Sequence, residues 1–176
     1  MRWAALLKGV NVGGNRKLPM AELKALVEGL GHTNVKTLLA SGNVVFDCDE
    51  DGAALETRLE QALETLGLNT DVVVRNLADI ERVIAADPFP DAAADHPSHY
   101  LVAFHRDPVP DGLIERVPEL YTGPERLKAI GRELYLDYAD NIGDSKLPQA
   151  MAKLKFPKLA TTRNWNTVIK LRDLLA

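Results

Sequence analysis

The sequence predicts an α+β fold made of two ferredoxin-like halves, each with the order βαββαβ followed by an extra helix, packed as one compact unit. Short apolar or β-branched runs alternate with stretches of helical periodicity along the chain. The order of these segments is the same in both halves. Matching residues are also similarly spaced, because Asn76 and Asn164 are 88 positions apart and Gly42 and Gly131 are 89 positions apart.

In the first half, strands are expected where apolar residues run consecutively, and helices where they recur every three or four positions. The expected strands are residues 3–8, 35–39, 44–46 and 72–74, and the expected helices are residues 23–30, 55–66 and 77–84. Gly31 and Gly67 are typical residues after a helix end. Asn76 is a good N-cap for the third helix, and Ser41-Gly42-Asn43 is a typical hairpin turn.

The second half repeats this order after a stretch rich in proline and alanine at residues 86–97. Its expected strands are residues 100–104, 126–130, 133–138 and 158–162, and its expected helices are residues 113–117, 147–154 and 165–175. We therefore predict an N-terminal subdomain at residues 1–86, a linker at 87–97 and a C-terminal subdomain at 98–176. The alternative is coincidence, because βαββαβ units are common.

The composition is that of an ordinary globular protein. The chain has 176 residues, of which 46% are hydrophobic and 26% are charged, and this excludes disorder, collagen and coiled coil for the whole chain. No apolar run is long enough to span a membrane, so no membrane partner is expected. The single cysteine, Cys48, cannot form an internal disulfide, which favours the cytoplasm.

Charge is distributed unevenly along the chain. The net charges of residues 1–46, 47–97, 98–144 and 145–176 are +4, −10, −4 and +6, which sum to −4. An acidic chain with two basic ends makes nucleic-acid binding unlikely, because such binding needs a broad basic face. The two ends form a local basic site if they meet in space, and otherwise they are two solvated surfaces.

Two polar segments are the main candidates for a binding site. Residues 8–17 combine glycines with three cations after the first strand, and residues 161–167 gather hydroxyls, amides and an arginine before the last helix. Together with the turn at residues 41–43 and the loop at 143–146, they predict a site for a small anion that is phosphorylated or nucleotide-like. The expected ligand-binding residues are Lys8, Asn11, Gly13, Gly14, Arg16, Ser41, Asn43, Ser145, Lys146, Thr162, Arg163 and Asn164. A glycine-rich turn and ordinary helix caps are the structural alternatives.

The last helix is expected to begin within a residue or two of Thr162, which places Arg163 in its first turn. A cation there opposes the helix dipole, so an anionic partner is expected. Arg163→Ala should then leave folding nearly intact and remove anion binding, whereas Arg75→Ala should do neither. The loops after the first and third strands are expected at one end of each sheet, and the hairpin and the exit of the fourth strand at the other.

The sequence offers no convincing catalytic group, cofactor motif or metal site. His96 and His99 follow acidic residues, but their spacing fits no strong zinc pattern. His32 is interpreted as peripheral. Cys48 lies among acidic residues, which disfavour its thiolate, and it is expected to be a poor nucleophile that serine can replace. A chelator is therefore expected to leave the melting temperature unchanged.

Four motifs resemble those of an uncharacterised, mostly bacterial family that is defined as a domain of unknown function. The segments that carry the resemblance are Leu6-Leu7-Lys8-Gly9-Val10-Asn11-Val12-Gly13-Gly14, Ser41-Gly42-Asn43-Val44-Val45-Phe46, Gly143 to Leu147, and Thr161 to Val168. In that family the first motif is Leu-Leu-Arg-Gly-Ile-Asn-Val-Gly-Gly, so Lys8 and Val10 are mild departures. The resemblance implies a two-part α+β fold and supplies no activity.

Three functions remain open at this point. The first is a module that binds a small anionic ligand at a basic cleft. The second is an enzyme acting on such a ligand, and the third is a structural or oligomerisation domain in which the motifs hold the two halves together. The oligomeric state is left open. Burial of Arg163 against carboxylates or carbonyls would favour the structural role, and a carboxylate directed into a cleft would favour the enzyme.

Overall fold

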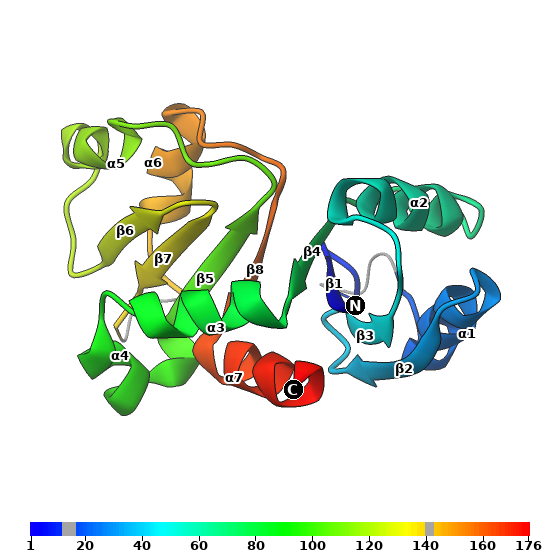
Figure 1. Ribbon diagram of the computed structural model, residues 1–176. Helices are drawn as coiled ribbons and strands as arrows, with labels where there is room; N and C mark the ends of the chain where they lie inside the picture. Colours follow the sequence, from blue (N-terminus) through cyan, green and yellow to red (C-terminus); the bar gives the residue numbers. More distant parts are fainter. Residues whose placement is uncertain (12–16, 140–142) are drawn as a thin grey trace. The chain divides into compact units, whose positions relative to one another are not determined.

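A computed structural model describes residues 1–11, 17–139 and 143–176 of the chain and confirms the predicted α+β class. It contains two four-stranded sheets, ordered β2-β3-β1-β4 and β6-β7-β5-β8, in which neighbouring strands are antiparallel (Figure 1). The strand order is the same in both sheets, and it is the order of the ferredoxin-like fold. No helix within the described ranges is both long enough and apolar enough to cross a membrane.

The elements of the two halves follow each other in the predicted order. The first half contains β1 (Arg2–Leu7), α1 (Met20–Gly29), β2 (Thr33–Leu38), β3 (Asn43–Asp47), α2 (Gly52–Glu64), β4 (Val72–Asn76) and α3 (Leu77–Ala86). Two short helices follow, α4 (Pro90–Asp95) and η1 (Pro97–His99). The second half contains β5 (Tyr100–His105), α5 (Leu113–Arg116), η2 (Val117–Glu119), β6 (Arg126–Ile130), β7 (Glu133–Asp137), α6 (Leu147–Lys153), β8 (Ala160–Asn164) and α7 (Trp165–Leu175).

The chain divides into two compact units. The first unit is Met1–Arg82 together with Lys170–Ala176, and the second unit is Val83–Ile169. These bounds differ from the predicted subdomains, and residues 83–86, expected in the first half, belong to the second unit. Residues 87–97, expected as a linker, carry α4 and the start of η1 and belong to the second unit, and the last part of α7 belongs to the first unit.

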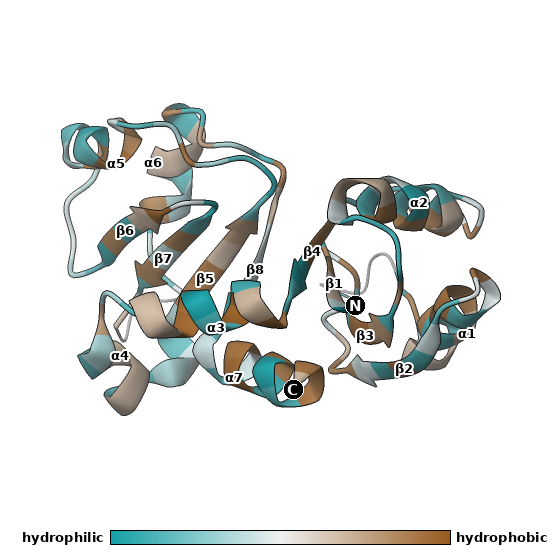
Figure 2. Ribbon diagram, viewed as in Figure 1, coloured by the Kyte–Doolittle hydropathy of each residue, from teal (hydrophilic) through white to brown (hydrophobic). Residues whose placement is uncertain are grey.

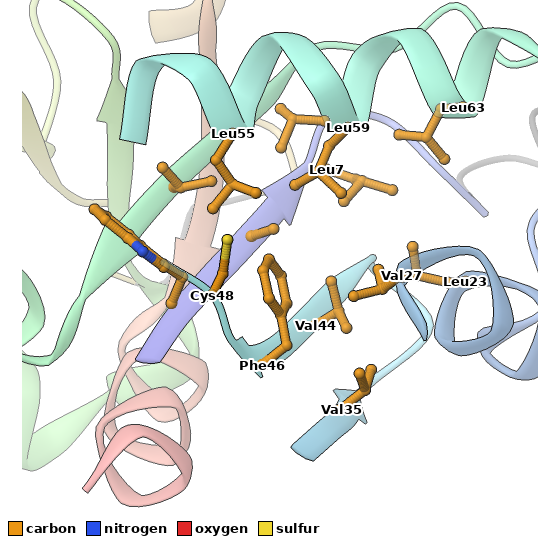
Figure 3. Packing of buried hydrophobic residues seen from close by; sticks show 14 of the residues in the cluster. Leu7, Leu23, Val27, Val35, Val44, Phe46, Cys48, Leu55, Leu59 and Leu63 are labelled. Carbon is orange, nitrogen blue, oxygen red and sulfur yellow. The ribbon is translucent and has the colours of Figure 1, made fainter. Parts of the chain in front are cut away.

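The core of the first unit lies between its sheet and helices α1 and α2. Leu55, Leu59 and Leu63 of α2 lie four positions apart, so they share one face of the helix, and each is at most 1% exposed. They point toward the strands, as do Leu23 and Val27 of α1 (Figure 3). Burying each side chain contributes about 1.5–3 kcal/mol, so this core is the main stabilising element of the unit.

The opposite face of the first sheet is also buried. Ala4 and Leu6 of β1 point away from the helical layer, yet both are 0% exposed. This agrees with the consecutive apolar residues of β1, which are typical of a strand covered on both faces. The end of β4 is hydrophilic (Figure 2), and it includes Arg75, which is also 0% exposed. At the margin of this face, Arg2 Nε donates to the carbonyl of Leu174 in α7 (3.0 Å).

The second sheet uses its aromatic residues as core. Tyr100 stacks on Trp165 with 4.8 Å between ring centroids and 14° between ring planes. The hydroxyl of Tyr135 donates to the carbonyl of Val83 (2.8 Å). Tyr100 and Tyr135 are at most 1% exposed, so neither ring is available for stacking on a base.

The antiparallel register corrects the expected placement of the loops. Leu6 pairs with Asn43 and Leu7 with Val72, so the end of β1, the β2–β3 hairpin and the start of β4 share one edge of the first sheet. The expectation that residues 8–17 and the hairpin lie at opposite ends was wrong, because β3 runs antiparallel to β1 and begins where β1 ends. In the second sheet Leu101 pairs with Leu136 and with Asn164, so β7 and β8 likewise end at a common edge.

Equivalent hydrogen bonds close the edge at which the first strand of each unit ends. Leu7 N donates to Gly42 O (2.9 Å) in the first unit, and His105 N donates to Arg132 O (2.9 Å) in the second. In each case the end of the first strand is attached to the hairpin between the second and third strands. The shared contacts, together with the identical strand orders, support the interpretation of the two halves as repeats of one supersecondary unit.

Candidate functional site

A hollow of about 390 Å³ opens at the edge of the first unit where β1 ends. Its lining is mostly apolar and comes from the β1–α1 connection, the start of α1 and the hairpin. The described lining residues are Asn11, Lys17, Leu18, Pro19, Met20 and Ala40. The volume lies within the range typical of small-molecule sites, roughly 300–1,000 Å³. The hollow is therefore large enough for a small organic ligand.

Asn11 builds the wall of this hollow. Its Nδ2 donates to the carbonyls of Leu18 (2.9 Å) and Ala40 (2.7 Å), and its Oδ1 accepts from Leu18 N (2.8 Å). Its φ of 55° is left-handed, a conformation that asparagine tolerates better than most residues. The amide group predicted to bind a ligand is thus engaged in joining the loop after β1 to the hairpin.

The hairpin residues are also held by internal hydrogen bonds. Asn43 is 0% exposed, and its Nδ2 donates to Leu38 O (2.8 Å) and to Ser41 Oγ (2.9 Å). Gly42 has a φ of +92°, and a Cβ added to it would lie 2.5 Å from Cγ2 of Val10. Close approach of the β1 loop therefore requires glycine at this turn.

Lys8 lies at the same edge, directly after β1. Its backbone N–H donates to Asp71 O (3.0 Å), and its carbonyl accepts from the Thr70 hydroxyl. Lys8 is half-buried and Lys17 is exposed, so two of the cations that the sequence singled out border this edge. Gly13, Gly14 and Arg16 lie outside the described residues.

Helix α1 begins at the hollow without a side-chain cap from the described residues. Pro19 occupies the N-cap position, and its carbonyl accepts from the N–H groups of Glu22 (3.0 Å) and Leu23 (3.1 Å). The N-terminus of a helix carries a partial positive charge and presents free N–H groups. Since Pro19 and Met20 line the hollow, this positive end faces it together with Lys17.

Three other helices have the caps that α1 lacks. Asp51 Oδ1 accepts from Ala54 N (2.9 Å) at the start of α2. Asn76 Oδ1 accepts from Asp79 N (2.9 Å) at the start of α3, and Asn164 Oδ1 accepts from Thr167 N (3.0 Å) at the start of α7. The two asparagine caps occupy matching positions of the repeat. Asn164, which was predicted to bind a ligand, therefore has a structural role at this helix start.

Arg163 lies in strand β8 and not in the first turn of α7, which begins at Trp165, three residues after Thr162. The expected helix start was wrong because residues 160–164 pair along β5. Arg163 is 7% exposed, and its Nη1 donates to Thr161 Oγ1 (2.7 Å) and to Thr162 O (2.8 Å). Burial lowers the pKa of its guanidinium to about 10. Burial against a carbonyl favours a structural role for this segment.

The remaining predicted residues of the second unit lie at the start of α6 and on β8. Ser145 Oγ accepts from Leu147 N (3.1 Å), so this hydroxyl supports the start of α6. Lys146 is the N-cap residue of α6 and is exposed, as is Thr162 on β8. The structure thus places Lys8, Asn11, Ser41 and Asn43 at one edge of the first sheet, whereas Thr162 and Arg163 lie within β8, opposite Ala103 and Val102.

His96 and His99, considered above as metal ligands, bind protein groups instead. His96 Nε2 lies 2.7 Å from Asp137 Oδ1, and His99 Nδ1 lies 2.5 Å from Ala139 O. Arg126 Nε donates to Asp137 Oδ2 (2.8 Å). Burial raises the pKa of the Asp137 carboxyl, but hydrogen bonds from the Ala139 N–H, Arg126 and His96 outweigh it and leave that pKa below its ordinary value.

Comparisons with known proteins agree with this fold. The family model described as "Protein of unknown function (DUF1697)" matches residues 1–135. No curated protein matches the chain. Among solved structures, the conserved bacterial protein SP0830 from Streptococcus pneumoniae is similar, with 25% sequence identity and a TM-score of 0.70. The similarity covers 99% of this chain and 98% of that one, so it extends across both units.

Proposed function

Because the chain belongs to DUF1697, a family of proteins of unknown function, its role must be inferred from its own site, and we propose that it binds a small organic anion at the start of α1. The observation that carries this proposal is the coincidence of three features at one hollow. The N-terminus of α1 has no side-chain cap from the described residues, Lys17 borders it, and the space is open to solvent.

The lining indicates what kind of anion fits. Leu18, Pro19, Met20 and Ala40 contribute apolar surface, whereas the positive charge is concentrated at Lys17 and the helix terminus. A fully inorganic anion would leave the apolar surface unused. A carboxylate or phosphate group attached to a small apolar body would place its charge on the N–H groups of α1 and its body against these side chains.

Two alternatives are supported less well by the same residues. No aspartate or glutamate is among the described residues that line the hollow, so it offers no carboxylate as a general base. A purely structural role accounts for Asn11 and Asn43, whose amides hold the loop and the hairpin. It gives no reason for the exposed Lys17 beside a helix start that no described side chain caps.

The test compares charged and neutral ligands of the same shape. Phenyl phosphate and benzoate should shift the amide resonances of Leu18, Met20 and Ala21 in a ¹H–¹⁵N spectrum, whereas benzyl alcohol should leave them unchanged. The dissociation constant should rise with ionic strength, because the charges involved are solvent-accessible. Equal shifts with benzyl alcohol would show that only apolar contact is measured, and the proposal would fail.

A matched pair of lysine variants locates the site. Lys17→Gln should weaken benzoate binding about fivefold, corresponding to ~1 kcal/mol for one charge near a helix N-terminus. Lys24→Gln removes an exposed lysine of α1, one turn after the helix start, and should leave the affinity unchanged. If both variants weaken binding equally, the effect is one of net charge and the site at α1 is refuted.

A further inference from the structure

A second group of side chains gathers at the opposite edge of the first unit, where β3 ends. His32 precedes β2, and Cys48 and Glu50 follow β3. The pairing of Thr33 with Asp47 brings the two segments together. One potential ligand atom of each side chain, a ring nitrogen, the thiol sulfur and a carboxylate oxygen, lies within 4.8 Å of the other two. The group borders a hollow of about 380 Å³.

His32 is held in place, but one of its ring nitrogens has no hydrogen-bond partner in the described part of the chain. It is 8% exposed, and its ring stacks on Phe46 with 4.9 Å between centroids and 17° between planes. Its Nε2 is buried and has no hydrogen-bond partner among the described residues. An unsatisfied polar atom in a buried ring is unfavourable, so a bound group that satisfies it would stabilise the fold.

Cys48 and Glu50 are held close to each other. Cys48 belongs to the apolar core (Figure 3), and its Sγ accepts from the backbone N–H of Glu50 (3.3 Å). Glu50 Oε2 is 3.8 Å from Sγ, and Glu50 Oε1 is hydrogen-bonded to Arg58. Arg58 also donates to Leu30 O (3.0 Å), which anchors the carboxylate from behind. The arrangement leaves Oε2 directed toward the sulfur.

We propose that His32, Cys48 and Glu50 bind a thiophilic divalent metal ion such as Zn²⁺. Imidazole nitrogen, thiolate sulfur and carboxylate oxygen are its usual ligands, at about 2.0–2.3 Å. A tetrahedral site would bring the ligand atoms to about 3.5 Å from one another, so the Cys48 sulfur and Glu50 Oε2, which are 3.8 Å apart, need to move little.

The proposed site has an open fourth position and a defined proton balance. Three protein ligands leave one position for water from the adjoining hollow. Metal binding forms the metal–sulfur bond and releases the thiol proton of Cys48 to solvent. The exposed Asp49 beside the site adds negative potential that attracts a cation. In this proposal His32 is a metal ligand and not a peripheral residue, and a chelator removes a bound ion where no effect was expected.

Cobalt(II) reports directly on the sulfur ligand. Titration of the full chain with Co²⁺ should produce a thiolate-to-metal charge-transfer band in the near ultraviolet with one ion bound, and Zn²⁺ should displace it. Cys48→Ser should abolish the band, and His32→Gln should weaken binding at least tenfold. Asp49→Asn removes a neighbouring carboxylate outside the ligand set and should retain the band.

Two controls keep the outcome decisive. Circular dichroism of the apo variants shows whether they fold, and if His32→Gln does not fold, Glu50→Gln provides the same affinity comparison with a less buried residue. Lys17→Gln should bind Co²⁺ like the wild type, because the anion site is independent of this one. Absence of a charge-transfer band in folded wild type, or its persistence in Cys48→Ser, would overturn the proposal.

Discussion

Replacing Arg163 by alanine should destabilise the protein by about 3–4 kcal/mol, in contrast to the small effect expected from the sequence. The variant loses the hydrogen bonds to Thr161 Oγ1 and Thr162 O. Bonds from a charged donor contribute about 1.5–3 kcal/mol each, or roughly 4 kcal/mol together, and the cavity left by the long side chain adds ~2–3 kcal/mol. The alanine variant no longer buries a charge, and this offsets part of the loss in the free energy of unfolding. The lowering of the Arg163 pKa to about 10 corresponds to roughly 3 kcal/mol.

The assay is urea denaturation followed by circular dichroism, with three comparison variants. Arg163→Met fills the space without a buried charge, so it should lie within about 1–2 kcal/mol of the wild type. Arg75→Ala, at the matching buried position of the first unit, should destabilise like Arg163→Ala. Arg116 is 57% exposed, so Arg116→Ala should change the free energy of unfolding by less than ~0.5 kcal/mol. If Arg163→Ala is as stable as the wild type, the guanidinium does not support the sheet and the structural role is refuted.

Two further substitutions test the turn and the buried carboxylate. Gly42→Ala should be less stable than Gly67→Ala, because both positions have positive φ but only the first places a Cβ 2.5 Å from Val10 Cγ2. Equal melting temperatures of the two variants would contradict this packing. Asp137→Asn should cost about 1.5–3 kcal/mol at neutral pH, because it removes the charged acceptor of Arg126, which is half-exposed and keeps its ion pair with Asp91. Because the pKa of Asp137 is lowered in the folded state, its contribution is complete above the ordinary value of 3.8 and is lost as the pH falls through the folded pKa. The difference between wild type and variant should therefore shrink in acid, and a constant difference would refute the assignment.

The elements could be predicted from the sequence because their signals are local. Consecutive apolar residues identified β1 and β4, and the cap at Asn76 was expected from residue type alone. The cap at Asn164 was only the alternative to a ligand-binding role. Each of these signals depends on neighbours within a few positions. The prediction of two similar halves was confirmed for the same reason, because the sequences of the two halves carry the same local signals in the same order.

The sites could not be predicted in the same way because they depend on pairing between distant segments. In β8, Thr161 and Arg163 are buried while Thr162 is exposed, which is the alternation expected of a strand. Because all three residues are polar, a search for alternating hydrophobic residues does not detect this strand. His32 looked peripheral after a helix stop, although the β2–β3 register sets its neighbour Thr33 opposite Asp47. From the register of this hairpin, the proximity of His32 and Cys48 could have been predicted.

The hydrogen bond from Arg2 to the carbonyl of Leu174 joins residues 172 positions apart within the first unit. A protein is synthesised from its N-terminus, and domains generally fold in that order. The strands of the first unit are synthesised first, but their unit is complete only after the last turns of α7 have been synthesised. On the ribosome, the second unit therefore has all of its residues available earlier, and the unit that is started first is finished last.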